Sequence, residues 1–106
     1  MSTLSTHVLD TALGQPAQGI KVTLKSVVDE LGSGVTDQDG RIKELTSGRL
    51  EPGNYQLTFD TAGYAAATNQ ETFFPEVTIT FTITDERHYH VPLLLSPFAF
   101  STYRGS

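Results

Sequence analysis

The chain is 106 residues long, with a formal net charge of −5, seven lysines and arginines, and no cysteine. That length predicts one domain, residues 1–106, built around a single core. The basic residues are few and scattered, which excludes the basic stripe of a nucleic-acid-binding protein. The lack of cysteine excludes disulfides, thiolate nucleophiles and cysteine-bound metal. No stretch resembles a signal peptide or a membrane span, so we expect a soluble, cytoplasmic protein without nucleic-acid or membrane partners.

Alternating apolar and polar residues predict five strands, each with one buried face and one face toward water. The clearest is the run 77–83, in which valine, isoleucine and phenylalanine alternate with threonines. The other four runs are residues 4–9, 20–25, 55–60 and 89–96. A further extended run is expected at residues 41–45, directly after a turn.

Glycine, proline and asparagine mark the segments between these runs. Residues 29–34 are predicted as a turn, and residues 37–40, Asp-Gln-Asp-Gly, as a tight turn whose glycine takes a positive φ. Residues 61–70 are the helix candidate, with room for one or two turns. With connections at 10–19 and 46–54, the pattern predicts an all-β fold, an antiparallel β-sandwich of seven to eight strands with one short helix.

The last nineteen positions, residues 88–106, contain two of the three histidines, three consecutive leucines and an arginine. Such a segment is expected to dock against the fold, because chain ends without a role are usually short and polar. If residues 89–96 form a strand, its two-residue period places His88 and His90 on one face. His7 joins them if the two ends of the chain meet in space or across a subunit boundary.

Motifs at four places in the chain carry a family resemblance. They are Leu-Ser-Thr-His-Val-Leu-Asp at 4–10, Phe-Phe-Pro-Glu-Val at 73–77, His-Tyr-His-Val-Pro-Leu-Leu-Leu-Ser-Pro at 88–97 and Ser-Thr-Tyr-Arg-Gly-Ser at 101–106. Together they resemble the 5-hydroxyisourate hydrolase family of transthyretin-like proteins. The closing Tyr-Arg-Gly-Ser is the most diagnostic motif, because transthyretin, a hormone carrier, lacks it. Residues 35–57 are similar to many prealbumin-like modules and support the fold alone.

The resemblance implies a homotetramer, a dimer of dimers of transthyretin/prealbumin-like sandwiches, with active sites at the dimer–dimer interface. It also implies hydrolysis of 5-hydroxyisourate to 2-oxo-4-hydroxy-4-carboxy-5-ureidoimidazoline in urate breakdown, without a cofactor or metal. The family's catalytic residues fall on His7, Arg41, His90 and Ser106, and its substrate-binding residues fall on His7, Arg41 and Tyr103.

Three positions depart from the family pattern. Phe98 and Phe100 stand where tyrosines are common, and Ala99 stands where glycine is common. These differences concern the lining of the channel mouth rather than the chemistry. His88 is interpreted as a structural or supporting residue, whereas for Arg104 a strand cap or subunit contact and a functional role stay open.

The implied reaction needs a base and a group that binds an anion. Histidine titrates near neutrality, which suits it to deprotonate a water molecule as the water attacks a carbonyl. A guanidinium has the planar shape to hold an anionic ring and to offset charge on the carbonyl oxygen. We therefore assign base and orienting duties jointly to His7 and His90 and substrate positioning to Arg41. Ser106 is expected to hydrogen-bond a histidine or the water.

Rival functions stay open at this point. Three imidazoles, His7, His88 and His90, with an open fourth position would suit a catalytic zinc. The transthyretin fold also carries a small aromatic ligand without catalysis, and a fold alone does not separate carriage from hydrolysis. A structural sandwich module without any site is a weaker third possibility.

Overall fold

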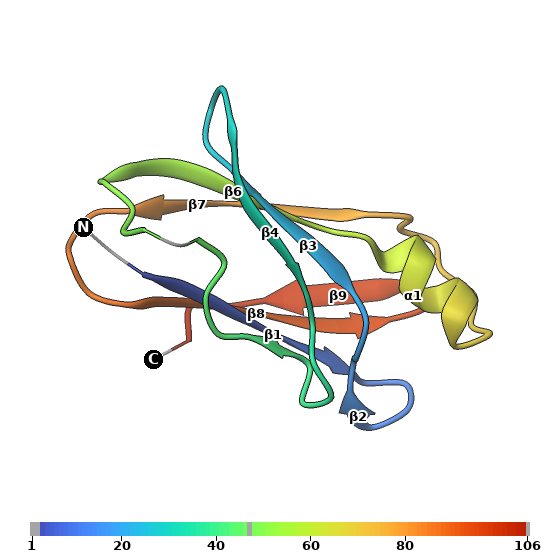
Figure 1. The fold of residues 1–106 in the computed structure, drawn as a ribbon. Helices are drawn as coiled ribbons and strands as arrows, with labels where there is room; N and C mark the ends of the chain where they lie inside the picture. Colours follow the sequence, from blue (N-terminus) through green and yellow to red (C-terminus); the bar gives the residue numbers. More distant parts are fainter. Residues whose placement is uncertain (1–2, 47, 106) are drawn as a thin grey trace.

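The computed structural model describes residues 3–46 and 48–105, which form two stacked β-sheets with one helix at an end of the sandwich (Figure 1). One sheet has the order β2-β1-β8-β9, with β5 also paired to β1, and the other has the order β4-β3-β6-β7. The elements in chain order are β1 (Leu4–Asp10), β2 (Gln15–Pro16), β3 (Lys21–Lys25), β4 (Glu30–Val35), β5 (Arg41–Ile42), β6 (Gly53–Phe59), α1 (Thr61–Ala67), β7 (Val77–Ile83), β8 (Tyr89–Ser96) and β9 (Ala99–Thr102).

The predicted β-sandwich with one short helix is confirmed. Strands β1, β3, β6, β7 and β8 lie where alternation of apolar residues predicted them. The apolar faces of the two sheets meet in one core, in which Val8, Leu24, Leu57, Phe59 and Leu93 have no exposed surface. Removing a side chain of this size from water contributes about 1.5–3 kcal/mol, so the core fixes which face of each strand points outward.

Helix α1 occupies part of the predicted segment 61–70. Asp60 caps it, because the Asp60 carboxylate accepts a hydrogen bond from the N–H of Gly63 (3.1 Å). The helix buries Thr61, Tyr64 and Ala65 against the sheets. Within residues 3–46 and 48–105, no helix has the length and apolar character needed to cross a membrane.

The turn predicted at residues 29–34 is wrong, because β4 occupies this segment and pairs antiparallel with β3. Glycines suggested the turn, but in the structure they permit close approach. A Cβ on Gly32 would collide with the carbonyl of Leu45, and Gly34 faces a side chain of β5. The glycines therefore let the chain after β5 pass over the strand, which is a long-range reason for their presence.

Two further differences concern pairing. β1 and β8 run parallel, from Leu4 beside Tyr89 to Asp10 beside Leu95, whereas the other strand pairs of the described residues are antiparallel, as predicted. A parallel pair needs a long crossover, and here all four strands of the second sheet lie between β1 and β8 in the sequence. The described residues form nine strands, more than the seven to eight predicted. β2 and β9 were not predicted, and the run expected at 41–45 forms a strand at Arg41–Ile42 alone.

Candidate active site

The outer face of the sheet β2-β1-β8-β9 carries the histidines. On β1 every second side chain from Leu4 to Asp10 is buried, which leaves Ser5 and His7 on the outer face. The parallel register sets Ser5 beside His90 of β8, and directly paired residues share a face of the sheet. The ring centroids of His7 and His90 lie 6.5 Å apart. The two segments that bear the histidines therefore meet within one chain.

Arg41 reaches this face through the tight turn that precedes it. The N–H of Gly40 donates to the carbonyl of Asp37 (2.9 Å), and the N–H of Arg41 donates to Oδ1 of Asp37 (3.0 Å). Gly40 has a φ of +74°, as predicted for this turn, and its carbonyl accepts from the N–H of Val8 (2.7 Å). β5 then sets Arg41 directly opposite His7. The docked turn thus places a guanidinium-bearing residue next to the first histidine.

Ser5 stands at the centre of a hydrogen-bonded chain that sequence reasoning missed. Its hydroxyl oxygen lies 2.7 Å from Nδ1 of His90 and 2.8 Å from Nε2 of His88. Nδ1 of His88 lies 2.5 Å from Oγ1 of Thr3. His88 and His90 therefore share a face, as predicted, and both bind one hydroxyl. Ser5 stands two positions before His7, so the sequence predicted that both lie on the same face of β1. The sequence did not predict that β8 is the neighbouring strand.

The electrostatic setting of this face favours a neutral imidazole. A shallow pocket on it is lined by Ser5, Thr6, Arg41, Ile42, Lys43, His88 and His90. Among these described lining residues there is no carboxylate. Burial, the charge of Arg41 and the neighbouring imidazoles of His7 and His88 together lower the pKa of His90. At neutral pH His90 is therefore held in the form that accepts a proton.

The segment after β9 closes over His90. The N–H of Gly105 donates to the carbonyl of His90 (2.8 Å), and the two residues form an isolated antiparallel bridge. A Cβ on Gly105 would lie 2.5 Å from Cδ2 of the His90 ring, so glycine lets the backbone lie against the imidazole. Tyr103 follows β9 and is 60% exposed, and it lines a different pocket, with Phe81, Tyr89 and Val91, rather than the one beside His90. Pro92 has no N–H to donate, and its carbonyl accepts a hydrogen bond from the hydroxyl of Thr102 (2.7 Å).

Ser106 and Arg104 complete the closing motif. Ser106, a predicted catalytic residue, lies outside the described residues. The guanidinium of Arg104 lies 4.4 Å from the centroid of the Tyr89 ring, a cation–π contact. Tyr89 is on the buried face of β8, away from His90. This contact favours the structural interpretation of Arg104, in which its side chain covers the edge of the core.

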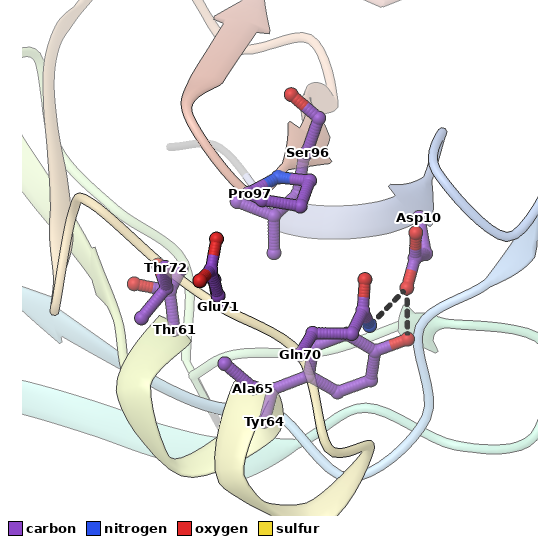
Figure 2. A pocket seen from close by; sticks show the side chains of 10 residues that line it. Asp10, Thr61, Tyr64, Ala65, Gln70, Glu71, Thr72, Ser96 and Pro97 are labelled. Atoms are coloured by element: carbon purple, nitrogen blue, oxygen red, sulfur yellow. Dashed lines mark hydrogen bonds between the residues drawn. The ribbon is translucent and has the colours of Figure 1, made fainter.

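A second pocket, shown in Figure 2, lies where α1 meets the end of β1. Tyr64 and Gln70 both point at the carboxylate of Asp10, and they donate to it at 2.6 Å and 3.0 Å. The N–H of Leu13 donates to the other carboxylate oxygen (2.9 Å). Burial would raise the pKa of Asp10, but these hydrogen bonds outweigh it and the pKa is lowered. The carboxylate is thus engaged in holding the helix to β1, which is a structural task.

The zinc alternative needs three histidines that converge on one point. The described part of the chain contains no group of three histidine, cysteine, aspartate or glutamate side chains placed to hold a metal ion. Instead, the facing ring nitrogens of His88 and His90 are bridged by the hydroxyl of Ser5.

Known proteins resemble this chain along nearly all of its length. Residues 4–105 match the model of the HIUase/transthyretin family. The chain is 48% identical over 113 residues to the 5-hydroxyisourate hydrolase of Mus musculus, covering 99% of this chain and 96% of that protein. It is similar to the Klebsiella pneumoniae 5-hydroxyisourate hydrolase structure, with a TM-score of 0.94, 42% identity and 100% of both chains covered. For sea bream transthyretin in complex with thyroxine, the TM-score is 0.89 at 31% identity, with 97% and 94% covered.

Proposed function

Because the chain belongs to the HIUase/transthyretin family, we propose that it hydrolyses 5-hydroxyisourate to 2-oxo-4-hydroxy-4-carboxy-5-ureidoimidazoline. The relatives named 5-hydroxyisourate hydrolase support this substrate. The single observation that carries the proposal is the meeting of His7, Arg41 and His90 on one outer face. A base next to a guanidinium is suited to hydrolysis of an anionic cyclic acyl-urea, and the adjacent pocket gives access to both.

In the proposed mechanism His90 is the general base. Its lowered pKa keeps the ring neutral, and Nδ1 is engaged by Ser5, so Nε2 is the nitrogen left to take a proton from the attacking water. His7 lies on the same face and orients the water or the substrate. The proton moves from water to Nε2 as the new carbon–oxygen bond forms, and it passes to the departing ring nitrogen as the carbon–nitrogen bond breaks.

Arg41 is the proposed electrostatic partner of this base. A guanidinium on the strand next to His7 is placed to bind the anionic ring and to offset charge that develops on the carbonyl oxygen. Tyr103, 60% exposed and in the segment between β9 and Gly105, is proposed to border the substrate. Ser106 keeps its proposed role as a hydrogen-bond partner of a histidine or the water.

A homotetramer, a dimer of dimers with sites at the dimer–dimer interface, is also part of the proposal. Its support is the edge position of β9, since an unpaired strand edge is a template for pairing with a second chain. Phe98, 65% exposed, and Phe100, 39% exposed, lie at this edge. The absence of cysteine supports a reducing cytoplasm as the proposed location.

The decisive experiment follows the decay of 5-hydroxyisourate freshly made from urate with urate oxidase. The protein should accelerate the decay, and His90→Ala and Arg41→Ala should each lower kcat/KM by about a hundredfold or more. Arg49→Ala, at an exposed arginine outside this pocket, is the matched control and should keep the wild-type rate. A folded wild-type protein that leaves the spontaneous decay unchanged would contradict the proposal.

The second candidate function is a ligand carrier. The similarity to sea bream transthyretin in complex with thyroxine favours it, because the two folds match closely. Against it stands the polar outer face, where an arginine and three histidines replace the apolar lining that suits a hydrophobic ligand. If the decay assay shows no acceleration, calorimetric titration with aromatic ligands tests this alternative.

A further inference from the structure

The hydroxyl of Ser5 is shared by two imidazoles at the edge of the proposed active site. Oγ lies 2.7 Å from Nδ1 of His90 and 2.8 Å from Nε2 of His88. The backbone places it there, because Ser5 on β1 pairs with His90 on β8. We propose that Ser5 and His88 are positioning residues that orient His90 and fix which of its ring nitrogens carries the proton. This inference rests on the proposed hydrolase function.

The shared hydroxyl couples the two rings. A serine hydroxyl has one hydrogen, and a neutral imidazole has one N–H. When Ser5 donates to one of the imidazoles, it accepts from the other, so the tautomers of His88 and His90 are set together. The chain continues to Thr3, whose Oγ1 lies 2.5 Å from Nδ1 of His88 and is able to donate or accept.

Hydrogen bonds along this chain can all be donated in one of two directions, and one direction allows His90 to act as a base. Proton transfer from water requires an unprotonated Nε2 on His90, which places the ring N–H on Nδ1, donating to Ser5. Ser5 then donates to Nε2 of His88, and Nδ1–H of His88 donates to Thr3. In the opposite direction His90 carries its proton on Nε2 and has no lone pair to offer there. The partners of Nδ1 therefore decide what Nε2 does.

The hydrogen-bonded chain from Thr3 to His90 requires a neutral His90 ring. The groups around His90 disfavour a second proton on it. The titratable groups that line the pocket or share this face are Arg41 and Lys43, His7 on β1 and His88 before β8. No described carboxylate lines the pocket to stabilise an imidazolium. Gly105 packs against the ring from the β9 side. The hydroxyl of Ser5 and the backbone of Gly105 therefore both lie against the His90 ring.

The tautomer is measured directly by long-range proton–nitrogen NMR spectra, which separate protonated from unprotonated ring nitrogens. With three histidines in the sequence, the His90 signals are assigned from the His90→Ala variant. The wild-type protein should show His90 protonated on Nδ1, and Ser5→Ala should show both tautomers. A spectrum of His90 unchanged by Ser5→Ala overturns the proposal, whatever the protein hydrolyses.

Kinetics give a second readout. Ser5→Ala should lower kcat about tenfold to a hundredfold with little change in KM, since the substrate still meets Arg41. Ser5→Thr keeps the hydroxyl and should recover most of the rate. Ser33→Ala makes the same exchange at an exposed position on β4, in the other sheet, and should leave kcat unchanged. Wild-type kcat in Ser5→Ala overturns the positioning role.

His88 is tested by a pair of variants. Glutamine places an amide near the position of Nε2 and binds Ser5 without titrating, so His88→Gln should keep the Nδ1–H tautomer of His90 and most of kcat. His88→Ala should lose both. Equal losses in the two variants overturn positioning in favour of proton transfer through His88. A wild-type protein that does not accelerate 5-hydroxyisourate decay contradicts the proposed function instead, because the NMR measurement does not depend on turnover.

Discussion

Gly105 is the residue whose replacement tests the proposed site most sharply, because its backbone lies against the ring of His90, the proposed base. The variant Gly105→Ala adds one methyl group at the point where the backbone lies against His90. It keeps every side chain of the site and the hydrogen bond from the Gly105 N–H to the His90 carbonyl (2.8 Å). We expect a folded protein with a much lower kcat.

The size of the effect follows from the geometry. The new Cβ would stand 2.5 Å from Cδ2, 3.1 Å from Cγ and 3.2 Å from Cβ of His90, whereas carbon atoms in contact sit at about 3.5–4.0 Å. The ring must therefore move by about 1 Å, and a displacement of that size at a catalytic group costs about a hundredfold in rate. Gly105 is partly exposed, so the cost in stability stays near or below about 1 kcal/mol, the low end for overpacking.

The assay is the decay of 5-hydroxyisourate, with circular dichroism and thermal unfolding to check the fold. Gly48→Ala is the matched control, because a Cβ on Gly48 meets nothing within 4 Å, and it should keep the wild-type kcat. A Gly105→Ala variant with wild-type kcat would refute the reasoning, since it would mean that the position of the His90 ring does not limit the rate.

Two further predictions concern charge and the buried carboxylate. Arg41→Gln removes a cation that lowers the pKa of His90, so the acid limb of the pH profile of kcat/KM should move to higher pH; an unmoved limb would argue against His90 as the base. Tyr64→Phe removes a donor to the buried carboxylate of Asp10 (2.6 Å) and should lower the free energy of unfolding by about 1–3 kcal/mol with kcat unchanged. Because the pKa of Asp10 is lowered in the fold, its contribution is present above its ordinary pKa and lost in acid, and urea titrations at several pH values measure both effects.

The alternation of apolar and polar residues predicted the strands that have one buried and one solvent-exposed face. The alternation in β1, β7 and β8 and the turn with a positive φ at Gly40 were readable, because each depends on neighbours in the sequence. The shared face of His88 and His90 was readable for the same reason. These features follow from the two-residue period of a strand and need no knowledge of its partner.

Contacts between distant segments were not readable. The glycines of β4 were misinterpreted as a local turn. A glycine is needed at position 32 because the carbonyl of Leu45, on a distant segment, leaves no room for a Cβ. The role of Ser5 depends on the parallel register that sets it beside His90, and a serine on a strand is ordinary without that register. Gly105 was expected as part of a motif, but the reason for a glycine there is the imidazole that its backbone touches.

The parallel pairing of β1 with β8 has a consequence for the order in which the protein gains its function. The hydrogen bond between Thr3 and His88 spans 85 positions of the chain, and contacts of such separation form slowly because a long loop must close first. β3 and β4 form a hairpin of segments that are close in sequence, and β6 pairs with β7 across the intervening helix α1. During refolding, strand content recovers as these pairs form, whereas Ser5 meets its imidazoles when β8 docks on β1. Enzymatic activity should therefore recover after the circular dichroism signal during refolding. The delay between the two measures the time that β1 and β8 take to pair.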